Sequence, residues 1–197
     1  MSKREIKVSV YIPSHNYGKY LGEAIESILR QTIDSWELFL INENSKDNTH
    51  DIMELYAGDE RIHIYSTPNL GLPGVANFVL DKVEGEYLIR LDADDVFDEN
   101  NLLVLSNYLD THPDVALVFP DYFLMDEAGY IYAQERRQPL YYRNHMLDIP
   151  PNGASTMVRT AELKRVGGYR SDLGAQDGFD LWNKILKDHK CANVNIP

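Results

Sequence analysis

The sequence predicts an α/β protein with a mostly parallel central sheet flanked by helices and a small antiparallel hairpin in its second half. Short apolar runs alternate with amphipathic helical patterns through the first half, as they do in strand–helix–strand units. Two apolar segments after residue 120 are separated by a short polar turn, as in a hairpin. The 197 residues, 44% of them hydrophobic, suffice for one domain with one sizeable core.

In the first half, β-branched or aromatic runs predict strands, and amphipathic runs predict the helices between them. The strands are expected at 7–12, 36–41, 62–65 and 87–91, and the helices at 21–31, around 52–56 and at 75–83. Asp47 or Asn48 is expected to cap the second helix. Residues 71–74 contain two glycines and a proline, which predicts a loop.

The second half mixes its elements. A helix at 102–109 and a strand at 115–119 continue the alternation, whereas 122–125 and 130–133 predict the two strands of the hairpin. The remaining elements are expected to be a loop at 150–153, a short strand at 155–158, and helices at 161–166 and 179–186. Gly167 and Gly168 are expected to end the first of these helices.

Composition argues against several classes of protein. The formal net charge of -12 comes from acidic residues spread along the chain, which argues against a nucleic-acid binder. Cys191 stands alone, so neither a disulfide framework nor a thiolate zinc cluster can form within one copy. No stretch approaches 18 consecutive apolar residues and no signal-peptide core follows Met1. We therefore expect a cytoplasmic protein, in which a cation would assist the binding of an anionic ligand.

An acidic cluster follows the fourth predicted strand. Asp92, Asp94 and Asp95 fall within four residues, and in an extended backbone Asp92 and Asp94 project from the same side. Like charges held that close repel, unless a cation or a ligand hydroxyl compensates them. The alternative is an acidic loop that starts the next helix, where carboxylates suit the helix dipole. Taken alone, the cluster fits both interpretations.

Polar loops follow the first two predicted strands. The first holds Pro13, Ser14, His15, Asn16 and Tyr17, whose aromatic ring could lie against a flat base. The second begins with Asn42 and Glu43. Each could be a plain strand-to-helix connection. In open parallel sheets, however, ligands collect outside the carboxyl ends of the strands, so loops that end neighbouring strands are candidate binding segments.

Taken in order, these segments resemble the family 2 glycosyltransferases. The matching segments are VSVYIPSHNYGKYLGEAIESILRQT, LFLINENSKDNT, NLGLPGVAN, GEYLIRLDADD, RVGGYR and QDGFDLW, which run from about Lys7 to Trp182. The resemblance implies a single nucleotide-diphospho-sugar transferase domain over residues 1–197, with the Rossmann-like GT-A fold. Its first half, about 1–98, would bind the nucleotide sugar, and its second half, about 99–197, would bind the acceptor.

The resemblance also implies a donor site with a divalent metal. Asp92-Ala93-Asp94 looks like the family's DxD motif, whose first carboxylate serves ribose and metal and whose last ligates Mn or Mg bridging the diphosphate. The positions that match the base and ribose site are Pro13, Ser14, His15, Asn16, Tyr17, Asn42 and Glu43, with Asn77 as a further donor-site match. Such a metal would offset the charge of the diphosphate and stabilise it as a leaving group.

For the catalytic base, the resemblance points to an aspartate just before a late helix, which would take the proton of the attacking acceptor hydroxyl. Asp177 is the first choice and Asp180 the runner-up. The usual pattern has the base four residues before the tryptophan, and that position here is Gly178. Asp177 could also cap the helix from Phe179 onward, and a capping aspartate can still act as the base.

The chain departs from the pattern elsewhere. Asn42 and Glu43 stand where many relatives carry two aspartates, so a preference for uracil is not implied, and Ala76 replaces a frequent arginine before Asn77. Some relatives use a later histidine as a metal ligand, and the sequence ends at Pro197. We therefore expect either a C-terminally truncated chain or a site completed by water.

The expected function is inverting, metal-dependent transfer of a sugar from a nucleotide-diphosphate donor to a saccharide or lipid-linked saccharide acceptor. Surface polysaccharide or glycolipid assembly, at the inner face of the membrane, is the usual setting of such relatives. The alternatives are a nucleotidyltransferase-like α/β enzyme and a non-catalytic nucleotide-sugar-binding relative. Against the first, the loop after the first strand lacks a glycine-rich, basic signature for a triphosphate. Against the second, the acidic cluster is retained.

Overall fold

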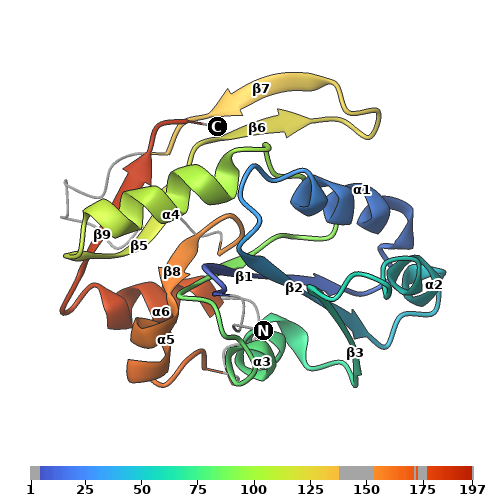
Figure 1. The fold of residues 1–197 in the computed structure, drawn as a ribbon, viewed down its shortest axis with the longest axis horizontal. Helices are drawn as coiled ribbons and strands as arrows, with labels where there is room; N and C mark the ends of the chain where they lie inside the picture. Colours follow the sequence, from blue (N-terminus) through green and yellow to red (C-terminus); the bar gives the residue numbers. More distant parts are fainter. Residues whose placement is uncertain (1–4, 138–152, 171, 173–176, 197) are drawn as a thin grey trace.

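The computed structural model describes residues 5–137, 153–170, 172 and 177–196, with only the backbone of 177–179 (Figure 1). The strands are β1 (Val8–Ser14), β2 (Trp36–Glu43), β3 (Ile62–Thr67), β4 (Tyr87–Arg90), β5 (Val115–Pro120), β6 (Tyr122–Met125), β7 (Ile131–Glu135), β8 (Met157–Arg159) and β9 (Lys190–Val194). The helices are α1 (Gly18–Leu29), α2 (Thr49–Glu54), α3 (Gly71–Leu80), α4 (Asn101–Thr111), α5 (Thr160–Arg165) and α6 (Asp177–Ile185). The predicted α/β class is confirmed.

The central sheet has seven strands in the order β3-β2-β1-β4-β8-β5-β9. Val10 of β1 lies level with Leu38 of β2 and Ile89 of β4, and both pairings are parallel. Only β8 runs antiparallel to its neighbours β4 and β5. The carboxyl ends of β1, β2, β3, β4 and β5 therefore meet at one edge of the sheet, where open α/β sheets bind ligands.

Helices cover both faces of this sheet, as Figure 1 shows, with α1, α2 and α4 on one side and α3, α5 and α6 on the other. On the first side Leu21, Ile25 and Ile28 of α1 are fully buried, which follows from their helical spacing. Burying each such side chain contributes about 1.5–3 kcal/mol. On the second side Trp182 of α6 is buried against Phe119 of β5. All residues of β1, β2 and β5 are buried, as expected of strands covered on both faces.

Two elements differ from the prediction. Residues 71–74, predicted as a loop, form the first turn of α3. Glu43 Oε1 accepts the backbone N–H groups of Leu70 and Gly71 at 2.7 and 3.0 Å, which satisfies that helix start, and proline is tolerated in a first turn. The strand β9 was not predicted, because its half-polar sequence becomes a strand only by pairing with β5.

The hairpin is confirmed as a separate two-stranded sheet of β6 and β7, although β7 begins at Ile131 and extends to Glu135. Asp126 Oδ1 accepts the N–H groups of Ala128 and Tyr130 and so fixes the turn between the strands. Most of the loop predicted at 150–153 lies outside the described residues, which include only Gly153.

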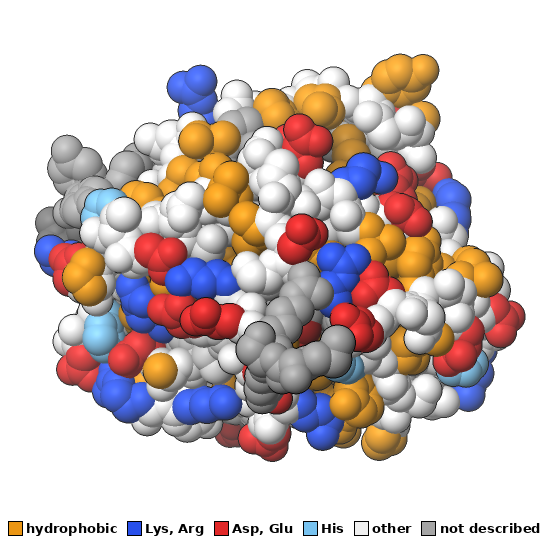
Figure 2. Space-filling view, in the orientation of Figure 1, with side chains coloured by type: hydrophobic (Ala, Val, Ile, Leu, Met, Phe, Trp, Pro, Cys, Tyr) orange, Lys and Arg blue, Asp and Glu red, His pale blue; other side chains and the backbone are white. Residues whose placement is uncertain are grey.

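Charged side chains of both signs are interspersed over the face drawn in Figure 2, in keeping with the distributed net charge of -12. Within the described ranges, no helix combines the length and the apolar content needed to cross a membrane.

Candidate functional site

The loops that follow β1 and β2 interlock at the carboxyl edge of the sheet. The N–H of Asn16 donates to Ser45 Oγ at 3.0 Å, and the N–H of Lys46 donates to Asn16 Oδ1 at 2.7 Å. His15 Nδ1 lies 2.6 Å from the backbone oxygen of Glu43. Asn16 itself has a φ of +62°, which asparagine tolerates better than most residues. The two polar loops of the sequence analysis thus lie side by side, with His15, Asn16 and Tyr17 exposed.

Asp47 fixes both helices that leave this edge. Its Oδ2 accepts the N–H of Gly18 at the start of α1, and its Oδ1 accepts the N–H and the hydroxyl of Thr49 at the start of α2. The hydroxyl of Thr49, followed by the backbone donors, lowers the pKa of Asp47. Asn48, the other predicted cap, makes no capping hydrogen bond. The carboxylate of Asp47 therefore caps both α1 and α2, whereas the sequence predicted Asp47 or Asn48 as a cap for the second helix only.

The side chains of Asn42 and Glu43 are buried and already engaged. Asn42 Oδ1 accepts the N–H of Ser45 at 2.9 Å, and Glu43 caps the first turn of α3. Beside them, the hydroxyl of Ser14 and, at the end of β3, that of Thr67 are buried and make no hydrogen bond in the part of the chain that the structure describes. A buried polar group without a partner is costly, so these two hydroxyls would gain from a bound polar ligand.

The acidic cluster lies at the tip of β4. Ala93 is 3% exposed and packs in the core, whereas Asp94 is exposed and Asp92 is half-buried, so the carboxylates on either side of Ala93 stay outside the core. Asp92 Oδ1 pairs with Arg90 Nε at 2.9 Å. Arg90 is buried, and sequence reasoning did not single it out, although an arginine ending an apolar strand was a visible signal. The charge of Arg90 therefore offsets that of Asp92, and Asp94 is the more solvent-accessible of the two carboxylates.

The remaining negative charge of the cluster is concentrated. Desolvation, followed by the charges of Asp92 and Asp94, raises the pKa of Asp95 to about 6. A divalent cation would relieve this repulsion, and carboxylate oxygens suit Mn²⁺ or Mg²⁺. Within the described ranges, no group of three or more acidic, histidine or cysteine side chains is arranged to hold a metal by itself. A metal at Asp92 and Asp94 would take its other ligands from a diphosphate and water.

Asn77 has a structural position. Its Nδ2 donates to the backbone oxygen of Tyr169 at 2.8 Å, and its Oδ1 accepts the N–H of Tyr169 at 2.9 Å. Gly168 makes this approach possible, since a Cβ there would meet Asn77 Oδ1 at 2.5 Å. Asn77 therefore ties α3 to the turn after α5, and its predicted contact with the donor stays a prediction.

The two candidate bases both lie on α6. Asp177 already lies within α6 as the structure describes that helix, rather than just before it, and its side chain lies outside the described residues. Asp180 Oδ2 forms an ion pair with Lys184 Nζ at 2.7 Å, one helical turn later. Lys184 also reaches the backbone oxygen of Gly168 at 3.3 Å. Asp180 is thus committed to a contact within its own helix.

Comparisons with known proteins bear on the family and the fold. The family model described as glycosyl transferase family 2 matches residues 9–164. The chondroitin synthase of Pasteurella multocida is 34% identical over 95% of this chain and 20% of its own. S. aureus TarS 1-349 in complex with UDP-GlcNAc superposes with a TM-score of 0.81 at 20% identity, over 96% of this chain and 56% of that one. The mannosyltransferase PcManGT of Pyrobaculum calidifontis, in complex with GDP-Man and Mn²⁺, gives 0.74 at 17% identity, over 98% and 56%.

These structural likenesses establish the fold. The chain spans 58% or less of the length of the curated relatives that it matches.

Proposed function

The chain belongs to glycosyl transferase family 2, and from this premise we propose that it transfers a sugar from a nucleotide-diphosphate donor to an acceptor hydroxyl. The observation that carries the proposal is the gathering of the loops after β1, β2 and β4 at one edge of the sheet, with the acidic tip of β4 among them. The likeness to a chondroitin synthase supports polysaccharide synthesis as the setting.

The donor is proposed to lie across the carboxyl ends of β1, β2 and β4. The exposed ring of Tyr17 and the imidazole of His15 border the space for the base, and the buried hydroxyl of Ser14 offers an unused hydrogen bond. Asn42 and Glu43 hold the loop backbones in position through their own hydrogen bonds. The ribose and diphosphate would then reach the tip of β4, where Asp92 and Asp94 lie.

We propose that Asp94 and Asp92 hold a divalent cation against the diphosphate. The closeness of the carboxylates supports this: after desolvation, the charges of Asp92 and Asp94 raise the pKa of Asp95, and Arg90 lies against Asp92. The bound cation would supply charge stabilisation for the departing diphosphate. The Arg90 guanidinium limits the cost of keeping Asp92 ionised before the donor arrives.

Asp177 is proposed as the general base, with inversion at the anomeric carbon. Its carboxylate would take the proton of the acceptor hydroxyl while that oxygen bonds to the anomeric carbon from the face opposite the diphosphate. The bond between the anomeric carbon and the diphosphate oxygen breaks with its electron pair, and the nucleoside diphosphate leaves. The supporting observation is that Asp177 lies on α6, where Asp180 already forms an ion pair with Lys184.

The test is a thermal-shift titration with UDP, GDP, dTDP and CMP sugars, each with Mn²⁺, Mg²⁺ or chelator. One nucleotide should raise the melting temperature only when metal is present, since a ligand at 100 times its Kd stabilises a protein by about 2.7 kcal/mol. Asp94→Ala should abolish this shift. Asp81→Ala removes an exposed aspartate at the end of α3 and should preserve it. Indifference of the wild type to all four nucleotides would overturn the proposal.

A further inference from the structure

Arg137, two residues after β7, carries a positive charge in an unusual environment. Its guanidinium carbon lies 5.4 Å from the ring centre of Phe119 and 5.0 Å from that of Tyr122. Its Nη1 is buried and makes no hydrogen bond within the described residues. Burial lowers the pKa of this guanidinium, which nevertheless stays charged. A planar cation held against two rings is fixed in orientation and lacks full compensation.

The nearby acidic group does not complete this environment. The carboxylate of Asp121 is buried, and its Oδ1 accepts the backbone N–H of Arg137 at 2.8 Å and the amide of Asn193 at 3.3 Å. Its charge acts on the guanidinium from a distance, since no carboxylate in the described part of the chain forms an ion pair with it. Because an incompletely paired buried charge is costly, an oxyanion that reached Nη1 would be bound favourably.

The position of Arg137 fits the acceptor rather than the donor diphosphate. Phe119 lies near the carboxyl end of β5 and packs on Trp182 of α6, with ring centres 5.2 Å apart, and Asp177 lies on the same helix. In the sheet, β5 is separated from β4 by β8 alone. Two strand spacings amount to roughly 10 Å, about the reach of one or two sugar rings.

We propose that Arg137 forms an anion subsite that takes the carboxylate or phosphate of an acidic acceptor saccharide. This inference rests on the proposed function and adds the chemical class of its acceptor. A guanidinium suits both anions through paired N–H groups, whereas a neutral saccharide would leave Nη1 without a partner. In a chain of net charge -12, such a fixed cation would also offset repulsion of an acidic acceptor.

The test follows the side-chain Nε–H signal of Arg137 by NMR, assigned through Arg137→Lys, during titration with sodium glucuronate, glycerol 3-phosphate or neutral methyl glucoside. We expect a saturable shift with one or both anions and none with the glucoside. The two anions identify whether carboxylate or phosphate is preferred. If neither anion moves the Nε–H signal of Arg137 at concentrations that saturate other anion-binding sites of the protein, the proposal is overturned. This readout uses the wild-type protein, so it does not depend on whether a glutamine variant folds.

Arg137→Gln should weaken binding of the preferred anion at least about tenfold, as expected for a lost charge-assisted hydrogen bond. Arg136→Gln is the matched control, because it removes the same charge from the exposed neighbouring residue, and it should change that affinity less than about twofold. If wild type and Arg137→Gln bound the anion with equal affinity and differed only in melting temperature, Arg137 would have a structural role through its stacking on the two rings and no part in anion binding. Donor binding measured on the same samples separates this failure from failure of the proposed function.

Discussion

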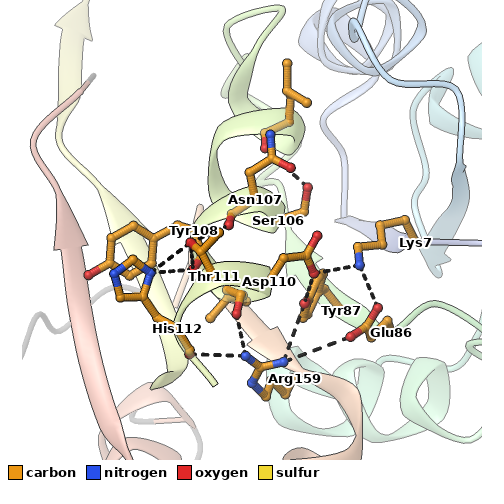
Figure 3. Close-up of polar contacts among 12 residues, drawn as sticks. Lys7, Glu86, Tyr87, Ser106, Asn107, Tyr108, Asp110, Thr111, His112 and Arg159 are labelled. Atoms are coloured by element: carbon orange, nitrogen blue, oxygen red, sulfur yellow. Dashed lines mark hydrogen bonds and ion pairs between the residues drawn. The ribbon is translucent and has the colours of Figure 1, made fainter. Parts of the chain in front are cut away.

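The two ends of the central sheet treat charge in opposite ways. At the amino ends of β1 and β4, Lys7 Nζ contacts Glu86 at 2.7 Å and Asp110 at 2.6 Å, and the Tyr87 hydroxyl donates to Asp110 at 2.5 Å (Figure 3). Although burial opposes it, hydrogen bonds from Lys7 and Tyr87 hold the pKa of Asp110 below its usual value. Charge at this end is matched within the protein.

Arg159 completes that network. Its guanidinium donates to the backbone oxygens of Leu109 and His112 at the end of α4, to that of Val115, and to the Tyr87 hydroxyl. Carbonyl groups at a helix end have no partner within the helix, so one side chain satisfies several of them. Figure 3 shows Lys7 in contact with both Asp110 and Glu86, and Arg159 reaching Glu86 and the Tyr87 hydroxyl.

At the carboxyl end, by contrast, acidic groups repel one another around Asp95, and the hydroxyls of Ser14 and Thr67 make no hydrogen bond among the described residues. Charges at the amino edge are therefore paired within the protein, whereas the carboxyl edge, where we propose that the donor binds, combines helix caps with closely spaced acidic groups. Substitutions at the amino edge should affect unfolding alone, and substitutions at the carboxyl edge should affect binding and transfer as well.

The largest effect is expected from Asp177→Asn, which should reduce turnover by ~10² to 10⁴ through loss of the general base. Donor binding and melting temperature should stay close to those of the wild type, as measured by calorimetry and thermal shift beside a transfer assay. If Asp180→Asn loses turnover and Asp177→Asn keeps it, the assignment of the base was wrong.

Arg159→Met should lower the free energy of unfolding by about 1–3 kcal/mol, because it removes the guanidinium donors to the backbone oxygens of Leu109, His112 and Val115. Arg165→Gln, which breaks exposed ion pairs with Glu162 and Asp188, should cost at most about 1 kcal/mol. Urea denaturation measures both. Since the amino edge lies opposite the proposed donor site, the stabilisation by donor and metal should be unchanged in Arg159→Met. If Arg159→Met lost the stabilisation by donor and metal, the two edges would not have separate roles.

Asp47→Ala should destabilise the protein by about 1 kcal/mol, the usual cost of losing a cap, and should loosen the donor-site loops. Hydrogen exchange should accelerate at the amides of Gly18 and Thr49, which lose their acceptor. Asn48→Ala, which removes no capping hydrogen bond, is the control and should leave both amides protected. Equal exchange in the two variants would contradict the role of Asp47.

The smallest effect concerns pH. The folded pKa of Asp95, about 6, exceeds the unfolded value of 3.8, so the folded state binds more protons between these values and its stability falls as pH rises through them. Because Asp95 is exposed as a residue, solvent screening limits the loss to about 1 kcal/mol or less. Asp95→Asn should remove this loss, seen as a gain over wild type at pH 7 that vanishes near pH 4. A divalent cation should reduce this gain in stability. A gain that did not change with pH would refute the assignment of the effect to the titration of Asp95.

The sequence by itself determined the class of fold and the order of most elements, because both depend on local periodicity. The buried faces of α1 and β2, the hairpin after β5 and the end of α5 at Gly167 all follow from spacing and turn chemistry. It also predicted an acidic cluster just beyond a strand, which the structure places after β4, but the extended backbone expected through Asp92 and Asp94 is instead a turn, in which the N–H of Asp95 donates to the backbone oxygen of Asp92.

Only the tertiary structure decided how those side chains are used. Glu43 lies 27 residues before Leu70, the helix start that it caps, and Asn77 lies 92 residues before its partner Tyr169. The antiparallel placement of β8 and the existence of β9 likewise depend on neighbours distant in the chain. The physical reason is that a polar group takes whichever partner folding brings within hydrogen-bond distance, and local pattern carries no record of that partner.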